Sequence, residues 1–368
     1  MKLSTPRSHF LAALQSVVRV SSTRSAIQAL AGVRIAAQGS TVELEATDGD
    51  LALHLTMPAT VEQDGAVLLP ARLLADVVRA LPDGDLLLTA RATEQDVEVA
   101  AGAAHFHIRT LRAEDFPELP APPSETVTLP ANALVQTTAN VARAASRDET
   151  RPVLTGILMS ASDHELRMVA TDSYRLSVKE TKLEQPVATG FEANVPARAL
   201  QELVRIAGQG PESTVHVGVS ESRIVFRADG AILSSRLIDG QFPNYRQLLP
   251  DSHEHELRLA TAELLDVVRR VSLLAQRNAP LQLAFTEGEL TISARTPDIG
   301  EASESLPVPF QGEPLEIGFN PDFLADGLES AGSDEVVLKL INPIRPGLIE
   351  AGDGSGFTYL IMPIRLNV

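Results

Sequence analysis

Two segments of the sequence place a threonine and an aspartate at the end of a predicted strand, Thr47-Asp48 and Thr171-Asp172. A carboxylate in such a position could act as the general base of a hydrolase. It could also close a turn, because aspartate readily hydrogen-bonds to the backbone two residues further along. We favour the turn, since a protein seldom needs an active site in every copy of a repeated segment.

A second candidate for chemistry is the run His253-Glu254-His255-Glu256, whose residue types are those of metal ligands. Neighbouring side chains of an extended chain point to opposite sides, so the four would not converge on one ion. We therefore interpret the run as a solvated charged segment, and we predict no metal and no cofactor. His105 and His107 alternate with apolar residues in a predicted strand, so we place them together on an exposed face.

Common enzyme motifs do not occur in the sequence. It contains no GxxxxGK[ST] phosphate loop, no HExxH zinc helix and no GxSxG nucleophile elbow. The glycine-rich run Gly352–Gly356 precedes a strand rather than a helix, so a hairpin loop is the better interpretation. The lack of cysteine excludes disulfides, thiolate zinc sites and a cysteine nucleophile. A hydrolase that uses Asp48, Asp172 or the run 253–256 stays open as an alternative, and it requires a deep polar cleft with shifted carboxylates.

These segments belong to a unit that occurs three times. Leu69–Arg79 resembles Val195–Arg205, and Leu111–Pro117 resembles Leu237–Pro243, each about 125 residues later. The Thr-Asp pairs recur at nearly the same offset, and Asn320–Asp326 is a weaker third copy of the first segment. The 368 residues therefore divide into three repeats. We predict their bounds at 1–121, 122–247 and 248–368.

Each repeat is predicted to contain two helices and several strands. Apolar residues at alternating positions predict strands, as at 41–46, 165–170 and 289–293. The second helix of each repeat is expected to begin at a proline, which has no amide hydrogen to lose there. The fold class is therefore α+β, with antiparallel sheets and two helices on one face of each repeat. Helical spacing predicts these helices over 6–20, 70–81, 130–147, 196–207, 260–277 and 320–331.

The charge of the chain appears at first to exclude nucleic acid. It has 31 Lys and Arg against 48 Asp and Glu, a net charge of -17, whereas phosphate binding needs positive surface. The predicted helices, however, hold eleven arginines and seven acidic residues. Glutamate forms helices as well as arginine does, so helix propensity alone does not explain the excess of arginine. We predict a basic helical face within an acidic exterior.

The beginning of the chain bears on where the protein works. Met1-Lys2-Leu3 leads directly into polar residues, so we expect no signal peptide. No apolar run approaches the roughly 18 residues of a membrane span. With cysteine absent as well, we expect a cytoplasmic protein with no membrane partner. An adhesive β-rich repeat protein is the second alternative, but it would usually carry an export signal.

Five segments match one known family in order: Arg151–Leu158, Ala170–Leu176, Asp239–Arg246, Asn342–Pro346 and Met362–Leu366. On these segments the chain resembles the bacterial replicative sliding clamp, the β subunit of DNA polymerase III holoenzyme, over essentially its whole length. The resemblance implies a non-enzymatic processivity factor for DNA replication. It also implies a ring-shaped, head-to-tail homodimer that encircles duplex DNA without reading its sequence.

The size of a duplex gives independent support for two chains in such a ring. Helices pack about 8–10 Å apart, so a ring of six would be only about 17 Å across and too tight for DNA. Twelve helices would give a ring about 35 Å across, with roughly 25 Å free inside. A duplex would pass through without its grooves being read, so binding would be independent of sequence.

The resemblance also implies three sets of functional residues. DNA would contact Arg24, which matches a family position. Further candidates, chosen from their place in the predicted helices and loops and not from the family, are Arg72, Arg79, Arg147, Arg151, Arg198, Arg205 and Arg277. The dimer interface would use Phe106, Leu273 and Leu274. A hydrophobic pocket between repeats two and three would bind short peptides of DNA polymerases, the clamp loader and other clamp-binding proteins. Its residues would be Leu154, Thr171, Ser173, Tyr174, Arg175, Leu176, Pro243, Arg246, Leu248, Asn320, Phe323, Ile344, Pro346, Leu360, Met362, Pro363, Ile364 and Arg365.

The chain departs from the family at two places near this pocket. Many members carry Gly-His where this chain has Ser173-Tyr174, so a larger side chain would change the width of the pocket or gate it. Asn367-Val368 extend past the usual end of the family and would lie close to the pocket. Both departures leave the preferred peptide open.

Overall fold

The computed structural model describes residues 1–22, 25–120, 123–208, 210, 212–275, 279–297 and 299–366. Within these ranges no helix is both long and apolar enough to cross a membrane. The α-helices are α1 (Arg7–Val18), α2 (Ala71–Ala80), α3 (Ala131–Val141), α4 (Ala197–Ile206), α5 (Thr261–Ser272) and α6 (Pro321–Ala331). Short 3-10 helices are η1 (Gln28–Ala31), η2 (Ala113–Asp115), η3 (Ala142–Ala144), η4 (Pro152–Thr155) and η5 (Tyr245–Leu248).

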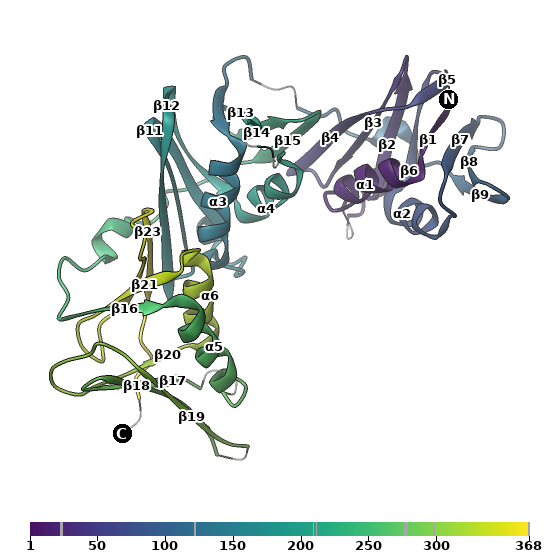
Figure 1. Ribbon diagram of the computed structural model, residues 1–368. Helices are drawn as coiled ribbons and strands as arrows, with labels where there is room; N and C mark the ends of the chain where they lie inside the picture. The colour runs from purple at the N-terminus through teal and green to yellow at the C-terminus, as the bar shows by residue number, and fades with distance from the viewer. Residues whose placement is uncertain are drawn as a thin grey trace. The chain divides into compact units, whose positions relative to one another are not determined.

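The chain forms two compact bodies, whose strands are all paired antiparallel (Figure 1). We call them the first body (Met1–Asn132 and Arg198–Leu237) and the second body (Ala133–Ala197 and Ile238–Val368). Helices and antiparallel sheets in both bodies confirm the predicted α+β class.

The first body contains a five-stranded and an eight-stranded sheet. The five-stranded sheet has the order β5-β1-β7-β8-β9, and the eight-stranded sheet has the order β10-β13-β14-β15-β4-β3-β2-β6. Figure 1 shows α1, α2 and α4 on the same face of the eight-stranded sheet. The strands are β1 (Lys2–Pro6), β2 (Gly32–Gln38), β3 (Thr41–Thr47), β4 (Leu51–Pro58), β5 (Thr60–Gln63), β6 (Gly65–Pro70), β7 (Asp85–Arg91), β8 (Asp96–Ala101), β9 (Ala104–Arg109), β10 (Val127–Pro130), β13 (Thr214–Val219), β14 (Arg223–Ala228) and β15 (Ala231–Arg236).

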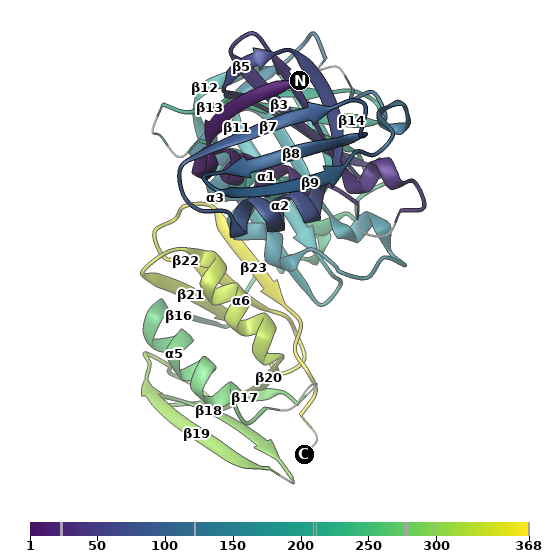
Figure 2. The same ribbon diagram turned by 90° about the vertical axis from the view of Figure 1, so that its right-hand side faces the viewer.

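The second body contains a six-stranded and a four-stranded sheet. Their orders are β11-β12-β23-β22-β21-β16 and β19-β18-β17-β20. Helices α5 and α6 lie side by side, and α6 packs on β22 and β23 (Figure 2). The strands are β11 (Gly156–Thr171), β12 (Arg175–Pro196), β16 (His255–Ala260), β17 (Leu281–Thr286), β18 (Glu289–Thr296), β19 (Gly300–Pro307), β20 (Leu315–Phe319), β21 (Glu335–Leu340), β22 (Gly347–Ala351) and β23 (Phe357–Ile361).

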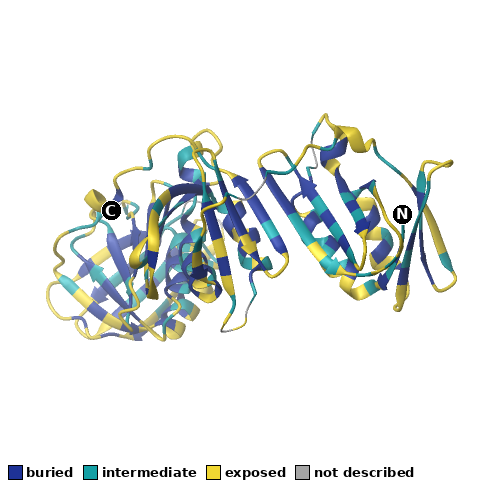
Figure 3. Cartoon of the chain, turned by 90° about the horizontal axis from the view of Figure 1, so that it is seen from above, coloured by how far each residue is buried: buried dark blue, intermediate teal, exposed yellow. Residues whose placement is uncertain are grey.

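Amphipathic patterns explain how helices and sheets pack within each body. In α1 the buried residues Phe10, Leu14 and Val17 follow helical spacing, so one side of the helix faces the sheet. In β3 buried and partly exposed residues alternate, which puts Val42 and Leu44 into the core. Figure 3 shows this alternation of buried and exposed residues along the strands of both bodies. The cores therefore form where the sequence pattern predicts them.

Two sheets cross the boundaries between the predicted repeats. Strand β15 of repeat two pairs with β4 of repeat one, and β23 of repeat three pairs with β12 of repeat two. The sequence does not reveal such pairing, because it depends on which strand edges meet in space. Backbone hydrogen bonds therefore join neighbouring repeats within each body.

Several predicted helix ends were wrong. Helix α3 stops at Val141 instead of reaching residue 147, and only the 3-10 turn η3 follows. Side chains of β12 donate hydrogen bonds to backbone carbonyls near this helix end. Ser177 Oγ donates to Asn140 O at 3.0 Å, and Arg175 donates to Arg143 O. Prolines 70 and 196 end β6 and β12 and precede their helices, and only Pro321 occupies a first helical position.

The prediction of net positive helices was also wrong. The observed α-helices hold seven arginines and seven acidic residues, so within the described ranges they are neutral. Arg19 and Arg147 lie beyond helix ends, and Arg143 lies in η3. Arg24 and Arg277 fall outside the described residues. The non-helical part of the chain therefore carries the whole net charge of -17.

Candidate functional site

The first functional segment is the tight turn between β11 and β12, at Thr171–Arg175. The hydroxyl of Thr171 donates to the carbonyl of Arg175 at 2.6 Å and accepts the amide of Ser173. Oδ1 of Asp172 accepts the amides of Tyr174 at 2.9 Å and of Arg175 at 3.0 Å. The turn therefore fixes the backbone of Tyr174, whose side chain is exposed.

Repeat one contains the same turn between β3 and β4. The hydroxyl of Thr47 donates to the carbonyl of Leu51 at 2.8 Å, and Oδ1 of Asp48 accepts two backbone amides. The second oxygens of both aspartates pair with arginines, Asp48 with Arg198 and Asp172 with Arg175. The predicted structural role of the Thr-Asp pairs is thereby confirmed, and neither carboxylate is free to act as a base.

Arg175 is the centre of the polar network beneath this turn. Its guanidinium donates to Asp172 Oδ2 at 3.1 Å, to Asp326 Oδ2 at 2.5 Å and to the carbonyl of Arg143. It also lies 4.3 Å from the centre of the Phe323 ring, a cation–π distance. Because Arg175 is only 8% exposed and its donors are engaged within the chain, it supports the site from below rather than offering a free contact.

The protonation states of this network follow from its surroundings. Burial would lower the pKa of Arg175, but Tyr359, Asp326 and Asp172 outweigh that effect and raise it. Burial raises the pKa of the Tyr359 hydroxyl, which donates to Phe323 O at 2.9 Å. Arg175 therefore stays charged and Tyr359 stays neutral at physiological pH.

An apolar floor lies next to the turn. Leu176 of β12 pairs with Leu360 of β23, and both belong to a buried cluster with Tyr245 and Leu348. Phe242 and Leu249, which flank η5, pack against the same cluster. Sequence reasoning missed these supporting residues, although Phe242 and Tyr245 lie in a family-matching segment. The cluster joins η5, β12 and the last two strands into one surface.

Large exposed apolar side chains surround this floor. The exposed fractions are 61% for Tyr174, 52% for Leu248, 66% for Ile344 and 41% for Met362. The ring of Tyr174 stacks on that of Phe323 with centroids 6.4 Å apart. Such side chains are normally covered, so this rim is a candidate surface for an apolar partner.

The last described residues are tied to the rim by the backbone. The amide of Met362 donates to Tyr174 O at 2.9 Å, and that of Ile364 donates to Gly318 O at 2.8 Å. Asn320 caps α6 by accepting the amide of Phe323 at 3.1 Å. The terminal segment is therefore held next to α6, while Asn367 and Val368 lie outside the described residues.

The predicted pocket residues fall into three groups by exposure. Leu154, Thr171, Arg175, Leu176 and Leu360 are buried and form the support. Asn320, Phe323, Pro346, Pro363 and Ile364 are half-buried. Ser173, Tyr174, Pro243, Arg246, Leu248, Ile344, Met362 and Arg365 are exposed.

A cavity of about 640 Å³ lies beside Tyr174. Tyr174, Arg175 and Phe323 of the predicted pocket line it, together with Arg147 and Arg151 of the predicted DNA-contact set. The loop after η3 and one side of α6 complete the walls, which carry charges of both signs. Two of the predicted residue sets therefore meet at Tyr174.

The predicted DNA-contact arginines that are described lie exposed in both bodies. Arg72, Arg79, Arg198 and Arg205 lie on α2 and α4 of the first body. Arg147 and Arg151 lie in the loop after η3 of the second body. Most of them are paired with carboxylates of the chain itself: Arg79 with Asp76, Arg151 with Asp148, Arg198 with Asp48 and Arg205 with Glu202.

The predicted interface residues lie at exposed positions near two sheet edges. Phe106, 41% exposed, lies on β9, the edge of the five-stranded sheet. Leu273, 83% exposed, and the half-buried Leu274 follow α5, whose Arg270 pairs with Glu304 of the edge strand β19. Each body therefore has one apolar group beside an edge strand that has a partner on only one side.

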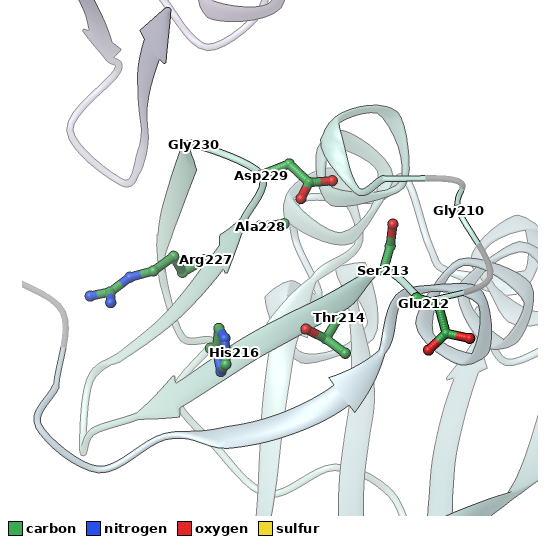
Figure 4. A pocket seen from close by; sticks show the side chains of 9 residues that line it. All are labelled: Gly210, Glu212, Ser213, Thr214, His216, Arg227, Ala228, Asp229 and Gly230. Carbon is green, nitrogen blue, oxygen red and sulfur yellow. The ribbon is translucent and has the colours of Figure 1, made fainter.

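Two other features carry no site. A cavity of about 500 Å³ in the first body includes Glu212, His216 and Arg227, but Figure 4 shows their side chains pointing apart. Glu43, Glu45 and His54 lie within ligand distance of one another. Burial would raise the pKa of Glu45, but hydrogen bonds from His54 and Arg34 outweigh it and lower the pKa. Glu45 is therefore engaged by Arg34 and His54 within the chain.

Known proteins similar to this chain cover it from end to end. Models of the DNA polymerase III beta subunit match its N-terminal domain at 1–120, its central domain at 128–244 and its C-terminal domain at 246–365. The beta sliding clamps of Streptomyces coelicolor and Synechococcus elongatus are 32% and 33% identical, with 100% of both chains covered. The solved sliding clamp of Bacillus subtilis is 29% identical and gives a TM-score of 0.92 over 100% of both chains. That of Bartonella birtlesii, bound to griselimycin, is 32% identical and gives 0.90 over 100% of both chains.

A threefold α+β repeat that sliding clamps match along its whole length defines the class of DNA sliding clamps, which are processivity factors and not enzymes. The chain belongs to the DNA polymerase III β-subunit family. The predicted family and the non-enzymatic role are thereby confirmed.

The backbone at Ser173 generates a first prediction. Its φ is +81°, whereas the equivalent residue of repeat one is glycine, Gly49, with φ +103°. A side chain in this region costs about 1–2 kcal/mol. We expect Ser173→Gly to raise the free energy of unfolding by about 1 kcal/mol, even though the 3.1 Å hydrogen bond from Arg151 to Ser173 Oγ is lost.

The matched control is Gly49→Ser. A Cβ at Gly49 meets no atom within 4 Å, so the substitution tests backbone conformation alone. It should lower the free energy of unfolding by about 1 kcal/mol. Urea denaturation of both variants provides the measurement, and a loss of stability in Ser173→Gly would contradict the assignment of strain.

The network around Arg175 generates a second prediction. Lysine keeps the charge but cannot reach Asp172, Asp326 and Phe323 together. We expect Arg175→Lys to lower the free energy of unfolding by about 3 kcal/mol, because the buried cation loses several of its partners at once. Arg246→Lys is the control, since Arg246 is exposed and lies 5.2 Å from the Tyr245 ring. Equal losses in the two variants would argue against a special role for Arg175.

Proposed function

We propose that two copies of the chain form a head-to-tail ring around duplex DNA and that the rim around Tyr174 and Met362 binds short peptides of partner proteins. The partners would be replicative and repair polymerases, the clamp loader and other proteins with clamp-binding peptides. The boundaries 1–121, 122–247 and 248–368 remain our division into repeats. The observation that best supports the ring is the strand pairing that joins neighbouring repeats within each body.

The two joints inside the chain are equivalent. Strands β4 and β12 follow the same Thr-Asp turn, and β15 and β23 occupy matching places in repeats two and three. The pair Ser234–Ala52 at the first joint corresponds to Leu360–Leu176 at the second. One register therefore serves both joints.

Two strands correspond to those at the joints but have no partner there. Strand β19 of repeat three corresponds to β4 and β12, and β9 of repeat one corresponds to β15 and β23. Each lies at the edge of its sheet and pairs on one side only. Pairing β19 of one copy with β9 of another would repeat the internal joint and satisfy both edges. Because the contact is head-to-tail, two such contacts close a ring.

The internal register also predicts which residues would face each other between copies. Comparison of the hairpin β18–β19 with β3–β4 makes Glu301 equivalent to Ala52. Comparison of β8–β9 with β14–β15 makes His107 equivalent to Ser234. His107 would therefore lie opposite Glu301 of the second copy, and Phe106 opposite Ala302. The two edges are also complementary in charge, since β9 carries His105, His107 and Arg109 and β19 carries Glu301 and Glu304.

The charge pattern supports a DNA passage without tight binding. The α-helices are neutral, and most of the candidate arginines are paired with carboxylates of the chain. Tight phosphate contacts would oppose movement along the duplex, whereas a balanced surface permits it. The acidic remainder of the chain would repel nucleic acid from other surfaces. DNA would then be held by closure of the ring.

A prediction for the ring concerns pH. Imidazole gains a proton near pH 6.5, so a histidine facing Glu301 pairs more strongly in acid. The dissociation constant of the dimer should fall roughly two- to tenfold as the pH falls from about 8 to about 6, because each ring would contain two such exposed pairs. Sedimentation should show a species of twice the 39.3 kDa chain mass.

The control for this prediction is His107→Gln. It removes the titrating group but keeps a polar side chain, so the pH dependence should largely disappear. Within the chain, His107 also lies opposite Glu98 of β8. Because the proposed partner is Glu301 of the second copy, Glu98→Gln should leave most of the pH dependence. A His107→Gln dimer with unchanged pH dependence would refute the inferred register, and a chain that is monomeric at every concentration would refute the ring.

A further prediction concerns the peptide-binding rim. Met362→Ser with Leu248→Ser removes two exposed apolar contacts without entering the core. A short apolar polymerase peptide should bind roughly a hundredfold more weakly, since each of the two contacts contributes about 1.5 kcal/mol. Titration calorimetry measures the affinity, and sedimentation should show the dimer unchanged.

The matched control is Ile27→Ser, since Ile27 is 53% exposed and belongs to the first body, whereas the rim belongs to the second. Its peptide affinity should equal that of the unmodified protein. We avoid Leu176 as a test position because it is 1% exposed and its loss would disturb the core. Equal peptide affinity in the double variant and the control would place the site elsewhere.

A further inference from the structure

Glu202 is the most deeply buried acidic side chain on the helical face of the first body, at 5% exposed. It lies on α4 and accepts hydrogen bonds from two arginines. Nε of Arg19, at the end of α1, lies 2.7 Å from Oε2, and Nη1 of Arg205 donates to Oε1. One carboxylate therefore holds two cations that come from different repeats.

Both arginines keep access to solvent. Their side chains are 36% and 51% exposed, whereas the side chain of Glu202 is only 7% exposed. A buried carboxylate is costly to leave unpaired, so it binds its partners strongly. A phosphate that draws either arginine outward therefore competes with Glu202 for it.

A neighbouring pair repeats this arrangement. Arg198, one turn before Glu202 on α4, donates to Asp48 Oδ2 at 2.5 Å and to Arg19 O at 2.9 Å. Arg72 on α2 differs, because it is exposed and no carboxylate lies within ion-pair distance of it among the described residues. The arginines of this face therefore fall into a restrained and an unrestrained kind.

We propose that Glu202 is a positioning residue that competes with DNA phosphate for Arg19 and Arg205 and so keeps the clamp mobile on the duplex. The inference rests on the proposed passage of DNA along this helical face. A phosphate that approaches Arg205 gains one ion pair only as another is released, so the net attraction is small. If Glu202 no longer holds the two arginines, both can bind phosphate, and this face should bind DNA more tightly.

The test is the salt dependence of binding of the full-length dimer to a short fluorescent duplex. Each phosphate contact contributes about 0.9 to the slope of log affinity against log salt. Glu202→Gln keeps the shape of the side chain but removes its charge, so the slope should steepen by up to about 1.8. Affinity at low salt should rise several-fold, and movement along DNA in single-molecule tracking should slow.

Two controls separate this effect from general charge. Glu287→Gln removes the same charge from an exposed hairpin turn of the second body and should leave the slope unchanged. Glu202→Gln combined with Arg19→Gln and Arg205→Gln should return the slope to the original value. A slope that Glu202→Gln leaves unchanged in a folded protein would overturn the proposal.

A second comparison remains decisive if Glu202→Gln does not fold. In the otherwise unmodified protein, Arg205→Gln should change the slope little, because Glu202 already restrains that arginine. Arg72→Gln should lower it by about 0.9. A full decrease with Arg205→Gln would overturn the proposal. If the unmodified dimer, assembled on a closed circular duplex, were not retained on it, the proposed function itself would fail, which is a distinct result.

Discussion

The constraint on which the structure depends is that backbone groups at a strand edge need partners. Within each body this need is met by a strand from the neighbouring repeat, β15 beside β4 and β23 beside β12. The bodies are built from parts of adjacent repeats for this reason. Of the strands equivalent to those at the two joints, β9 and β19 keep one unpaired edge, and we propose that a second copy of the chain completes them in the same register.

A second feature is the pairing of arginines with carboxylates of the chain itself. Arg175 connects the turn after β11 to α6 and to the ring of Phe323, which shapes the exposed rim. Arg19 and Arg205 are held by Glu202 on the helical face of the first body. In our proposal the same chemistry stiffens the peptide-binding rim and moderates the attraction for DNA.

The sequence was informative where structure depends on local pattern. The Thr47-Asp48 and Thr171-Asp172 turns, the strand alternation and the repeat itself could be predicted, because each depends on residues close in the chain. Ion-pair partners could not be predicted, since Arg175 and Asp326 are 151 residues apart and Arg19 and Glu202 are 183 apart. The early end of α3 could not be predicted either, because side chains of β12 capture its last carbonyl groups. The apparent positive charge of the helices came from arginines that lie beyond the observed helix ends.

Retention on circular DNA tests topological binding most directly. The dimer is assembled on a closed circular duplex and separated from free protein at high salt, which weakens attachment through charge. A closed ring should stay on the circle and leave when one cut makes the DNA linear. Equal retention on circular and linear DNA would contradict encirclement and would indicate ordinary surface binding instead.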